Sequence, residues 1–151
     1  MQLTRGAGYA RNGIMSAGEA DQPAGPQAPK SLFWMGGSLD DIRQFPDEVK
    51  QVIGFALYQA QTGGKHVAAK PLTGFGGAGV LEIVADDDGS TYRGVYTVKF
   101  SGVVYVLDAF QKKSKKGART PRADVNRVRI RLKAAEDHYR NWRSLQQEEN
   151  E

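Results

Sequence analysis

The sequence predicts an α+β fold: a mostly antiparallel sheet with an N-terminal helix pair before it and one C-terminal helix after it. Changes in the spacing of apolar residues along the chain indicate this order of elements. Apolar residues recur at helical spacing over residues 38–62, alternate with other residues over 79–110, and return to helical spacing after residue 120. With 151 residues, 40% of them hydrophobic, the chain is long enough for one domain with its own core. We therefore expect a single folded domain over residues 30–140.

The two ends lack the pattern of a packed domain. Residues 1–29 are rich in Gly, Ala, Pro and Gln, so we expect a disordered leader or tag-like extension there. Residues 141–151 form an acidic tail that we expect to fray. The leader has no apolar block of a secretory signal, and no apolar run approaches the roughly 18 residues that cross a bilayer. Because cysteine is also absent, we expect a cytoplasmic protein without a membrane.

A short strand and two helices are predicted first. Residues 31–35 (SLFWM) form an apolar run that ends at two glycines. Ser38 then has the character of an N-cap, with an acidic residue in the first turn. Pro46 opens a second helix in the favoured first-turn position, and Gly63 ends it. Each helix has one apolar face, which predicts an antiparallel pair with that face buried.

Three strands and a helix are predicted next. Residues 80–85 and 91–100 flank the turn signal DDDG, and residues 103–110 follow a Ser-Gly turn. Thr120 is the expected N-cap of the last helix, with a proline at its first position. Several basic residues stay largely outside the apolar stripe of this helix. They are Arg122, Arg127, Arg129, Arg131 and Lys133.

Positive charge is concentrated late in the chain. Residues 110–133 contain ten Lys or Arg and a single acid, Asp124, whereas the rest of the chain is net negative. Such segregation favours a polyanionic partner, and a solvated basic helix face is the alternative. His66 and His138 belong to no metal-ligand spacing, so we expect no metal and no small-molecule cofactor.

The candidates for chemistry are therefore cationic. The predicted catalytic residues are Lys70, Arg93, Lys112 and Lys113. Lysine and arginine bind phosphate through charge, and arginine also through two parallel hydrogen bonds. Arg93 has an equally good structural interpretation, an ion pair with Glu82 on the neighbouring strand. The residues expected to bind RNA beside them are Phe110, Gln111, Lys115, Lys116 and Arg119.

Phe110 has two interpretations of its own. An aromatic ring among cations can stack an unpaired base, which suits single-stranded RNA. The same ring can simply be the last core residue of its strand. The sequence leaves both open.

Three segments carry a resemblance to a known family. They are KPLTGFGGAGVLEI (70–83), TYRGVYTV (91–98) and VYVLDAFQKKSKKGARTP (104–121). In this order they resemble the RelE/HigB-type toxins of type II toxin–antitoxin systems, specifically the phage-derived-protein branch of that superfamily. The resemblance covers about residues 30–140, nearly the whole predicted domain.

The resemblance implies a compact RNase-like toxin fold that binds the ribosome and cuts mRNA at the decoding site. It also implies a helix-turn-helix antitoxin as protein partner. By position, Arg93, Lys70 and the pair Lys112–Lys113 match functional residues of the family. No residue matches the catalytic histidine or C-terminal tyrosine of some relatives. We hypothesise that Lys112 serves as base or acid, because the charges of its lysine neighbours favour loss of its proton.

Two other functions stay open at this point. One is inhibition of DNA gyrase, as in ParE-like toxins, because a shared fold does not fix an activity. The other is a non-catalytic nucleic-acid-binding module of phage origin.

Overall fold

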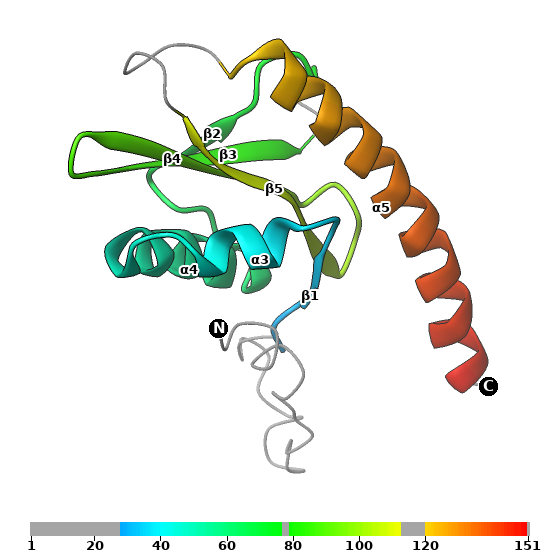
Figure 1. Ribbon diagram of the computed structural model, residues 1–151. Helices are drawn as coiled ribbons and strands as arrows, with labels where there is room; N and C mark the ends of the chain where they lie inside the picture. Colours follow the sequence, from blue (N-terminus) through cyan, green and yellow to red (C-terminus); the bar gives the residue numbers. More distant parts are fainter. Residues whose placement is uncertain (1–27, 77–78, 113–119, 151) are drawn as a thin grey trace, which may run out of the picture.

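The computed structural model describes residues 28–76, 79–112 and 120–150. Five strands and three helices make up these parts of the chain (Figure 1). In chain order they are β1 (Ser31–Trp34), α3 (Ser38–Arg43), α4 (Asp47–Gln61), β2 (Ala69–Pro71), β3 (Val80–Asp87), β4 (Ser90–Thr97), β5 (Val103–Lys112) and α5 (Arg122–Glu149).

The strands form one sheet in the order β1-β5-β4-β3-β2. β1 lies parallel to β5, and the other three pairings are antiparallel. Between β1 and β5 the chain passes through α3 and α4 to β2 at the opposite edge of the sheet, and it returns through β3 and β4 to β5. The predicted α+β class with a mostly antiparallel sheet is confirmed.

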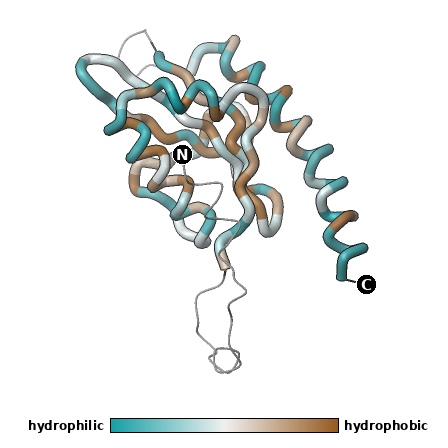
Figure 2. Tube along the Cα trace, turned by 60° about the horizontal axis from the view of Figure 1, so that its bottom comes forward, coloured by the Kyte–Doolittle hydropathy of each residue, from teal (hydrophilic) through white to brown (hydrophobic). Residues whose placement is uncertain are grey.

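Helices cover both faces of the sheet. α3 and α4 contribute Ile42, Val49 and Ile53 to a core with one face of the strands. On the other face, Val128 and Ala135 of α5 pack against residues such as Tyr105 and Leu107 of β5. Figure 2 shows apolar positions concentrated in the sheet, whereas the last turns of α5 are mostly hydrophilic. Both helices of the predicted N-terminal pair exist and share one buried side.

Three details of the predicted elements differ from the structure. Ser38 was expected as an N-cap, but Gly37 occupies that position and Ser38 is the first residue of α3. β2 was not predicted, because it has only three residues and ends at Pro71, which confines it to the sheet edge. Thr120 was expected as the N-cap of the last helix, and this was wrong. Pro121 occupies the cap position without a side-chain cap bond. The Thr120 hydroxyl oxygen instead accepts from Arg93 Nη1 at 2.9 Å, and the hydroxyl donates to Glu82 Oε2 at 3.1 Å.

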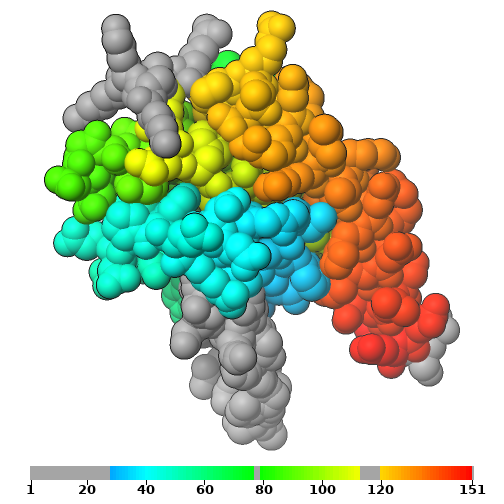
Figure 3. Space-filling model, in the orientation of Figure 1, coloured from blue at the N-terminus to red at the C-terminus, as the bar shows by residue number. Residues whose placement is uncertain are grey.

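The ends of the predicted domain are only partly described. The expected disordered leader lies almost entirely outside the described residues. At the other end, α5 continues without a break to Glu149, so residue 141 is not a boundary in the helix. Figure 3 shows the last turns of α5 projecting from the body of the molecule, and their fraying stays a prediction. Among the described residues, no helix combines the length and apolarity needed to cross a membrane.

A β-bulge alters the pattern of β5. Val95 of β4 pairs with Asp108, but the next residue, Tyr96, pairs with Val106. Leu107 is therefore the extra residue, and it turns to the same face as its neighbour Asp108. Leu107 packs in the core beneath α5, and the Asp108 carboxylate reaches two arginines of that helix. The bulge thus places a charged group inside an otherwise apolar interface.

Candidate functional site

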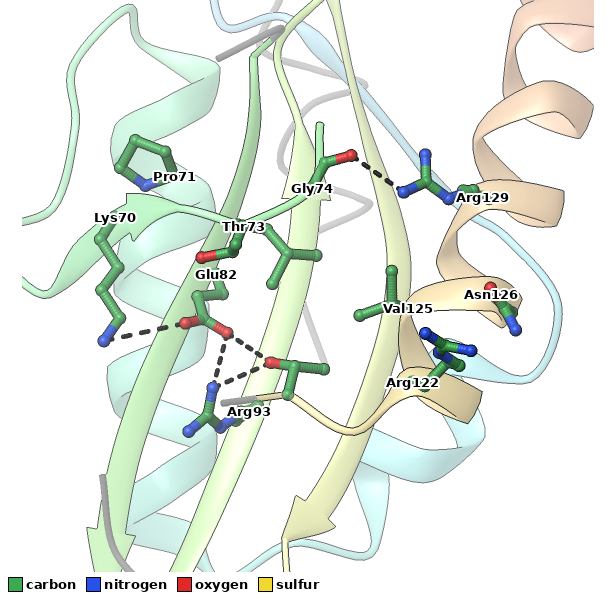
Figure 4. Close-up of a pocket in the computed structure, with 12 residues that line it drawn as sticks. Lys70, Pro71, Thr73, Gly74, Glu82, Arg93, Arg122, Val125, Asn126 and Arg129 are labelled. Atoms are coloured by element: carbon green, nitrogen blue, oxygen red, sulfur yellow. Dashed lines mark hydrogen bonds and ion pairs between the residues drawn. The ribbon is translucent and has the colours of Figure 1, made fainter. Parts of the chain in front are cut away.

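A cleft of about 780 Å³ opens between the edge of the sheet and the first turns of α5. β2, β3 and β4 form one wall, and α5 forms the other (Figure 4). The charged residues that line it in the described part of the chain are Lys70, Glu82, Arg93, Arg122 and Arg129. Cations therefore outnumber acids around this cleft, which favours an anionic ligand.

Glu82 lies at the centre of a network on the floor of the cleft. Its Oε2 accepts a hydrogen bond from Arg93 Nη1 at 2.8 Å and one from the Thr120 hydroxyl at 3.1 Å. Its Oε1 lies 3.8 Å from Lys70 Nζ. These residues meet because Lys70 pairs with Glu82 across β2 and β3, while Arg93 points to the same face from β4. Figure 4 shows the three side chains converging on the carboxylate.

Burial differs sharply within this network. Glu82 is 5% and Arg93 3% exposed, whereas the side chain of Lys70 is 61% exposed. The ion pair between Arg93 and Glu82, the structural interpretation left open by the sequence, is thus present and almost fully buried. Lys70 is the member of the network that a ligand can reach first.

Lys112 belongs to the same face and the same cluster. It pairs with Thr91, two residues before Arg93 on β4, so the two cations share a face of the sheet. Lys112 is only 4% exposed. Burial lowers its pKa, repulsion from Arg93 and then from Lys70 adds to this, and Glu82 works in the opposite direction. The structure therefore brings Lys70, Arg93 and Lys112 together.

The other predicted site residues lie elsewhere. Phe110 packs partly buried against the core beneath α5, with the guanidinium carbon of Arg127 6.0 Å from its ring centroid. Gln111 faces the opposite side of the sheet, where its amide donates to the Ser90 hydroxyl at 3.0 Å. The remaining predicted residues lie outside the described parts of the chain: Lys113, Lys115, Lys116 and Arg119.

Several residues of the cleft were not among the predicted site residues, and Thr120, Arg122 and Arg129 are three of them. Thr120 joins the Glu82 network, and Arg122 and Arg129 project from α5. Arg129 Nη2 donates to the carbonyl of Gly74 at 2.9 Å, and its guanidinium carbon lies 4.7 Å from the ring centroid of Phe75. The signal in the sequence was the seven-residue spacing of the two arginines, which places them on one side of a helix.

A second cluster of acids and arginines fastens α5 to the sheet. Asp108 Oδ2 accepts from Arg127 Nε at 2.9 Å, and Oδ1 accepts from Arg131 Nη1 at 3.1 Å. Arg127 also binds Asp124, and Arg131 Nη1 donates to the Leu107 carbonyl at 2.9 Å. Burial raises the pKa of Asp108, and the attraction of the two arginines opposes that rise. These arginines lie outside the apolar stripe, as predicted, but they turn toward the sheet.

Each histidine forms a hydrogen bond within the protein. His66 Nδ1 accepts a hydrogen bond from the backbone of Ala68 at 2.9 Å, and His138 Nδ1 lies 2.7 Å from the Tyr105 hydroxyl. Within the described residues, no three His, Asp or Glu side chains are grouped as ligands for a metal ion.

Comparison with known proteins gives a family. The family model described as "Phage derived protein Gp49-like (DUF891)" matches residues 40–133. No curated protein matches the sequence. Among solved structures, a chain of the toxin–antitoxin complex RelBE2 from Mycobacterium tuberculosis is similar, with 16% identity and a TM-score of 0.38 over 60% of this chain and 100% of that one. The family model spans most of the sheet, the cleft and half of α5. The chain therefore belongs to the Gp49-like family of phage-derived proteins, a family of RelE-type toxins.

Proposed function

We propose that this protein is the toxin of a type II toxin–antitoxin system and that it inhibits translation as a ribosome-dependent mRNA endoribonuclease. The observation that carries the proposal is the convergence of Lys70, Arg93 and Lys112 on one face of the sheet, beside an open cleft. The membership in a family of RelE-type toxins supports the same activity.

The charge of the site suits a phosphodiester. Glu82 is the acid at the centre of these three cations, so the described residues of the cluster carry more positive than negative charge. Arg122 and Arg129 add to the positive potential at the opposite wall. In a cleft partly shielded from water, these charges stabilise the additional negative charge that a phosphate acquires in the transition state.

The proposed reaction uses the ribose of the RNA as its nucleophile. The 2′-oxygen bonds to phosphorus while the bond from phosphorus to the 5′-oxygen breaks, which gives a 2′,3′-cyclic phosphate and a 5′-hydroxyl. Lys112 is almost fully buried beside the cleft, so we propose that in its neutral form it accepts the proton of the 2′-hydroxyl through one intervening water, a role that its lowered pKa favours. The departing 5′-oxygen takes a proton from an ammonium group, for which the exposed Lys70 is our candidate.

Arg93 has an indirect place in this scheme. It is held by Glu82 and Thr120 and is almost fully buried, so its charge acts from the floor of the cleft. Glu82 in turn fixes the direction in which Arg93 and Lys70 point. We assign Glu82 the role of a positioning residue, because its carboxylate accepts hydrogen bonds from Arg93 and Thr120 and lies 3.8 Å from Lys70 Nζ.

The proposal includes partners and a location that follow from the family. A helix-turn-helix antitoxin would bind and silence the toxin, and the ribosome would present the mRNA. The protein would act in the cytoplasm without a metal or an organic cofactor.

Mapping of RNA ends tests the proposed function. The purified protein is added to translating ribosomes with a defined mRNA, and new 5′ ends are located. We expect cleavage within codons by the wild type and by Lys133→Met, an exposed control, and none by Lys112→Met. Intact mRNA combined with inhibited gyrase supercoiling would favour a ParE-like inhibitor. Intact mRNA with salt-dependent RNA binding alone would favour a non-catalytic module.

A further inference from the structure

Arg129 is held in a fixed position at one end of the cleft. It reaches from α5 to the connection between β2 and β3, where Nη2 donates to the Gly74 carbonyl at 2.9 Å (Figure 4). Its guanidinium carbon lies 4.7 Å from the ring centroid of Phe75, which is the distance of a cation–π contact. Two neighbouring residues of the loop therefore orient one arginine of the helix.

The backbone of the loop makes this contact possible. Gly74 has a φ of +101°, in the region where residues with a side chain are strained. A Cβ at this position would lie 3.4 Å from Arg129 Nη2. Glycine thus leaves room for the guanidinium, while Phe75 is anchored by packing against the core beneath α5. We call the layered pair of Phe75 and Arg129 the arginine shelf.

Arg129 differs from Arg127 and Arg131 of the same helix. Arg127 and Arg131 form ion pairs with Asp108, which lies between the helix and the sheet. Arg129 is exposed, lines the cleft, and makes no ion pair with a carboxylate among the described residues. Its guanidinium carbon lies over the ring of Phe75, and the side chain remains exposed, so a ligand in the cleft can reach it.

We propose that the arginine shelf stacks an unpaired nucleobase of the single-stranded RNA whose phosphate lies in the cleft. Guanidinium planes are common stacking partners of splayed RNA bases, and they also attract the neighbouring phosphates. This inference rests on the proposed function, since it names the part of the RNA that the same cleft binds. It transfers the stacking role from Phe110, whose ring packs against the core beneath α5, to Arg129.

Binding of RNA with and without bases tests the shelf. The wild type is titrated with a short 2′-O-methyl oligonucleotide, which cannot be cleaved, and with versions that are abasic at one position at a time. Stacking is worth about 1–3 kcal/mol per base, so we expect one abasic position to weaken binding by about tenfold. Arg129→Lys keeps the charge and loses the plane, and it should bind all versions about equally. Arg140→Lys, an exposed change further along α5, should retain the wild-type preference.

Several results would overturn the proposal. They are equal binding of all versions by the wild type, a preference retained by Arg129→Lys, no binding at all, and a loss in Arg129→Lys that is the same for every version. The last would show a phosphate contact only. Cleavage on ribosomes, measured with the same proteins, separates the two proposals. If the protein cleaves mRNA but shows no preference for oligonucleotides with all their bases, the stacking proposal is wrong and the proposed function stands. If it shows that preference but does not cleave, the proposed function is wrong and the stacking proposal stands.

Discussion

Two clusters of acids and cations lie on the same face of the sheet, and they differ in how their charges balance. In the Asp108 cluster, Arg127 and Arg131 are matched by Asp108 and Asp124. In the Glu82 cluster, Lys70, Arg93 and Lys112 surround a single carboxylate at the edge of a cleft.

The difference indicates what each cluster is for. The Asp108 cluster joins α5 to β5, and every acid in it has an arginine partner, which is the composition of a structural contact. The Glu82 cluster has cations from three strands, and these outnumber the acid that pairs with them among the described residues. Such an excess costs stability unless an anion arrives. We therefore assign the first cluster to folding and the second to the substrate.

The largest effect is expected from Lys112→Met. Loss of a proton acceptor lowers rates by at least about 100-fold, or about 2.7 kcal/mol of barrier. Methionine has a similar length and no charge to bury, so the protein should stay folded. Single-turnover cleavage of ribosome-bound mRNA checks this, with Lys133→Met as the control. A wild-type rate for Lys112→Met would remove Lys112 from the mechanism.

Asp108→Asn should lower the free energy of unfolding. Removing the charge leaves Arg127 and Arg131 without their shared carboxylate, and breaking a buried pair is costly. Both arginines retain some access to water, so we expect a loss of about 2 kcal/mol in the free energy of unfolding, below the roughly 3–5 kcal/mol of fully buried pairs. The urea midpoint measures it. An unchanged midpoint would mean that the cluster contributes nothing to the attachment of α5.

Glu82→Gln tests how the negative charge of Glu82 affects the cations of the Glu82 cluster. Glutamine can still accept a hydrogen bond from Arg93, but the negative charge that raises the pKa of Lys112 is lost. The pKa of Lys112 should fall further, so the limb on which the rate rises with pH should move to lower pH. We also expect the plateau rate to fall by about tenfold, because Lys70 and Arg93 lose their anchor.

Glu136→Gln, on the outside of α5, is the matched control for this pH profile. It should leave both limbs in place. A profile that moves to higher pH in Glu82→Gln would contradict the assignment of Lys112 as the base.

The smallest effect is expected from Asp137→Asn. Asp137 pairs with Arg140 on α5 as Asp108 pairs with Arg127, but its side chain is 54% exposed. Exposed pairs contribute little, so the free energy of unfolding should change by less than about 0.5 kcal/mol. The same urea titration compares it with Asp108→Asn. Equal losses in the two variants would show that burial is not what distinguishes these pairs.

Most strands and helices could be predicted because the periodicity of apolar residues depends only on residues close together in the sequence. The alternation over 80–85 and 91–100 and the apolar stripe with Val128 and Ala135 depend only on neighbouring residues. The β-bulge was not predictable in this way. It turns Leu107 and Asp108 to one face, against the alternation of a regular strand, and it exists only through the pairing of β5 with β4.

The candidate site divides in the same way. Lys70, Arg93 and Lys112 were predicted because the family pattern marks each of them in its own segment. Glu82 was considered only as a partner of Arg93, and its central place depends on the register of β2, β3 and β4. Phe110 was weighed for stacking because it adjoins the lysines in sequence, whereas tertiary packing brings Phe75 and Arg129 together.

The most direct measurement compares the effects of the two clusters on stability and on cleavage in one experiment. Unfolding free energy and cleavage rate per folded molecule are determined for Lys112→Met and Asp108→Asn. We expect Lys112→Met to lose cleavage and keep its stability, and Asp108→Asn to lose stability and keep its cleavage. The contradictory result is the opposite pairing, with cleavage intact in Lys112→Met and abolished in fully folded Asp108→Asn.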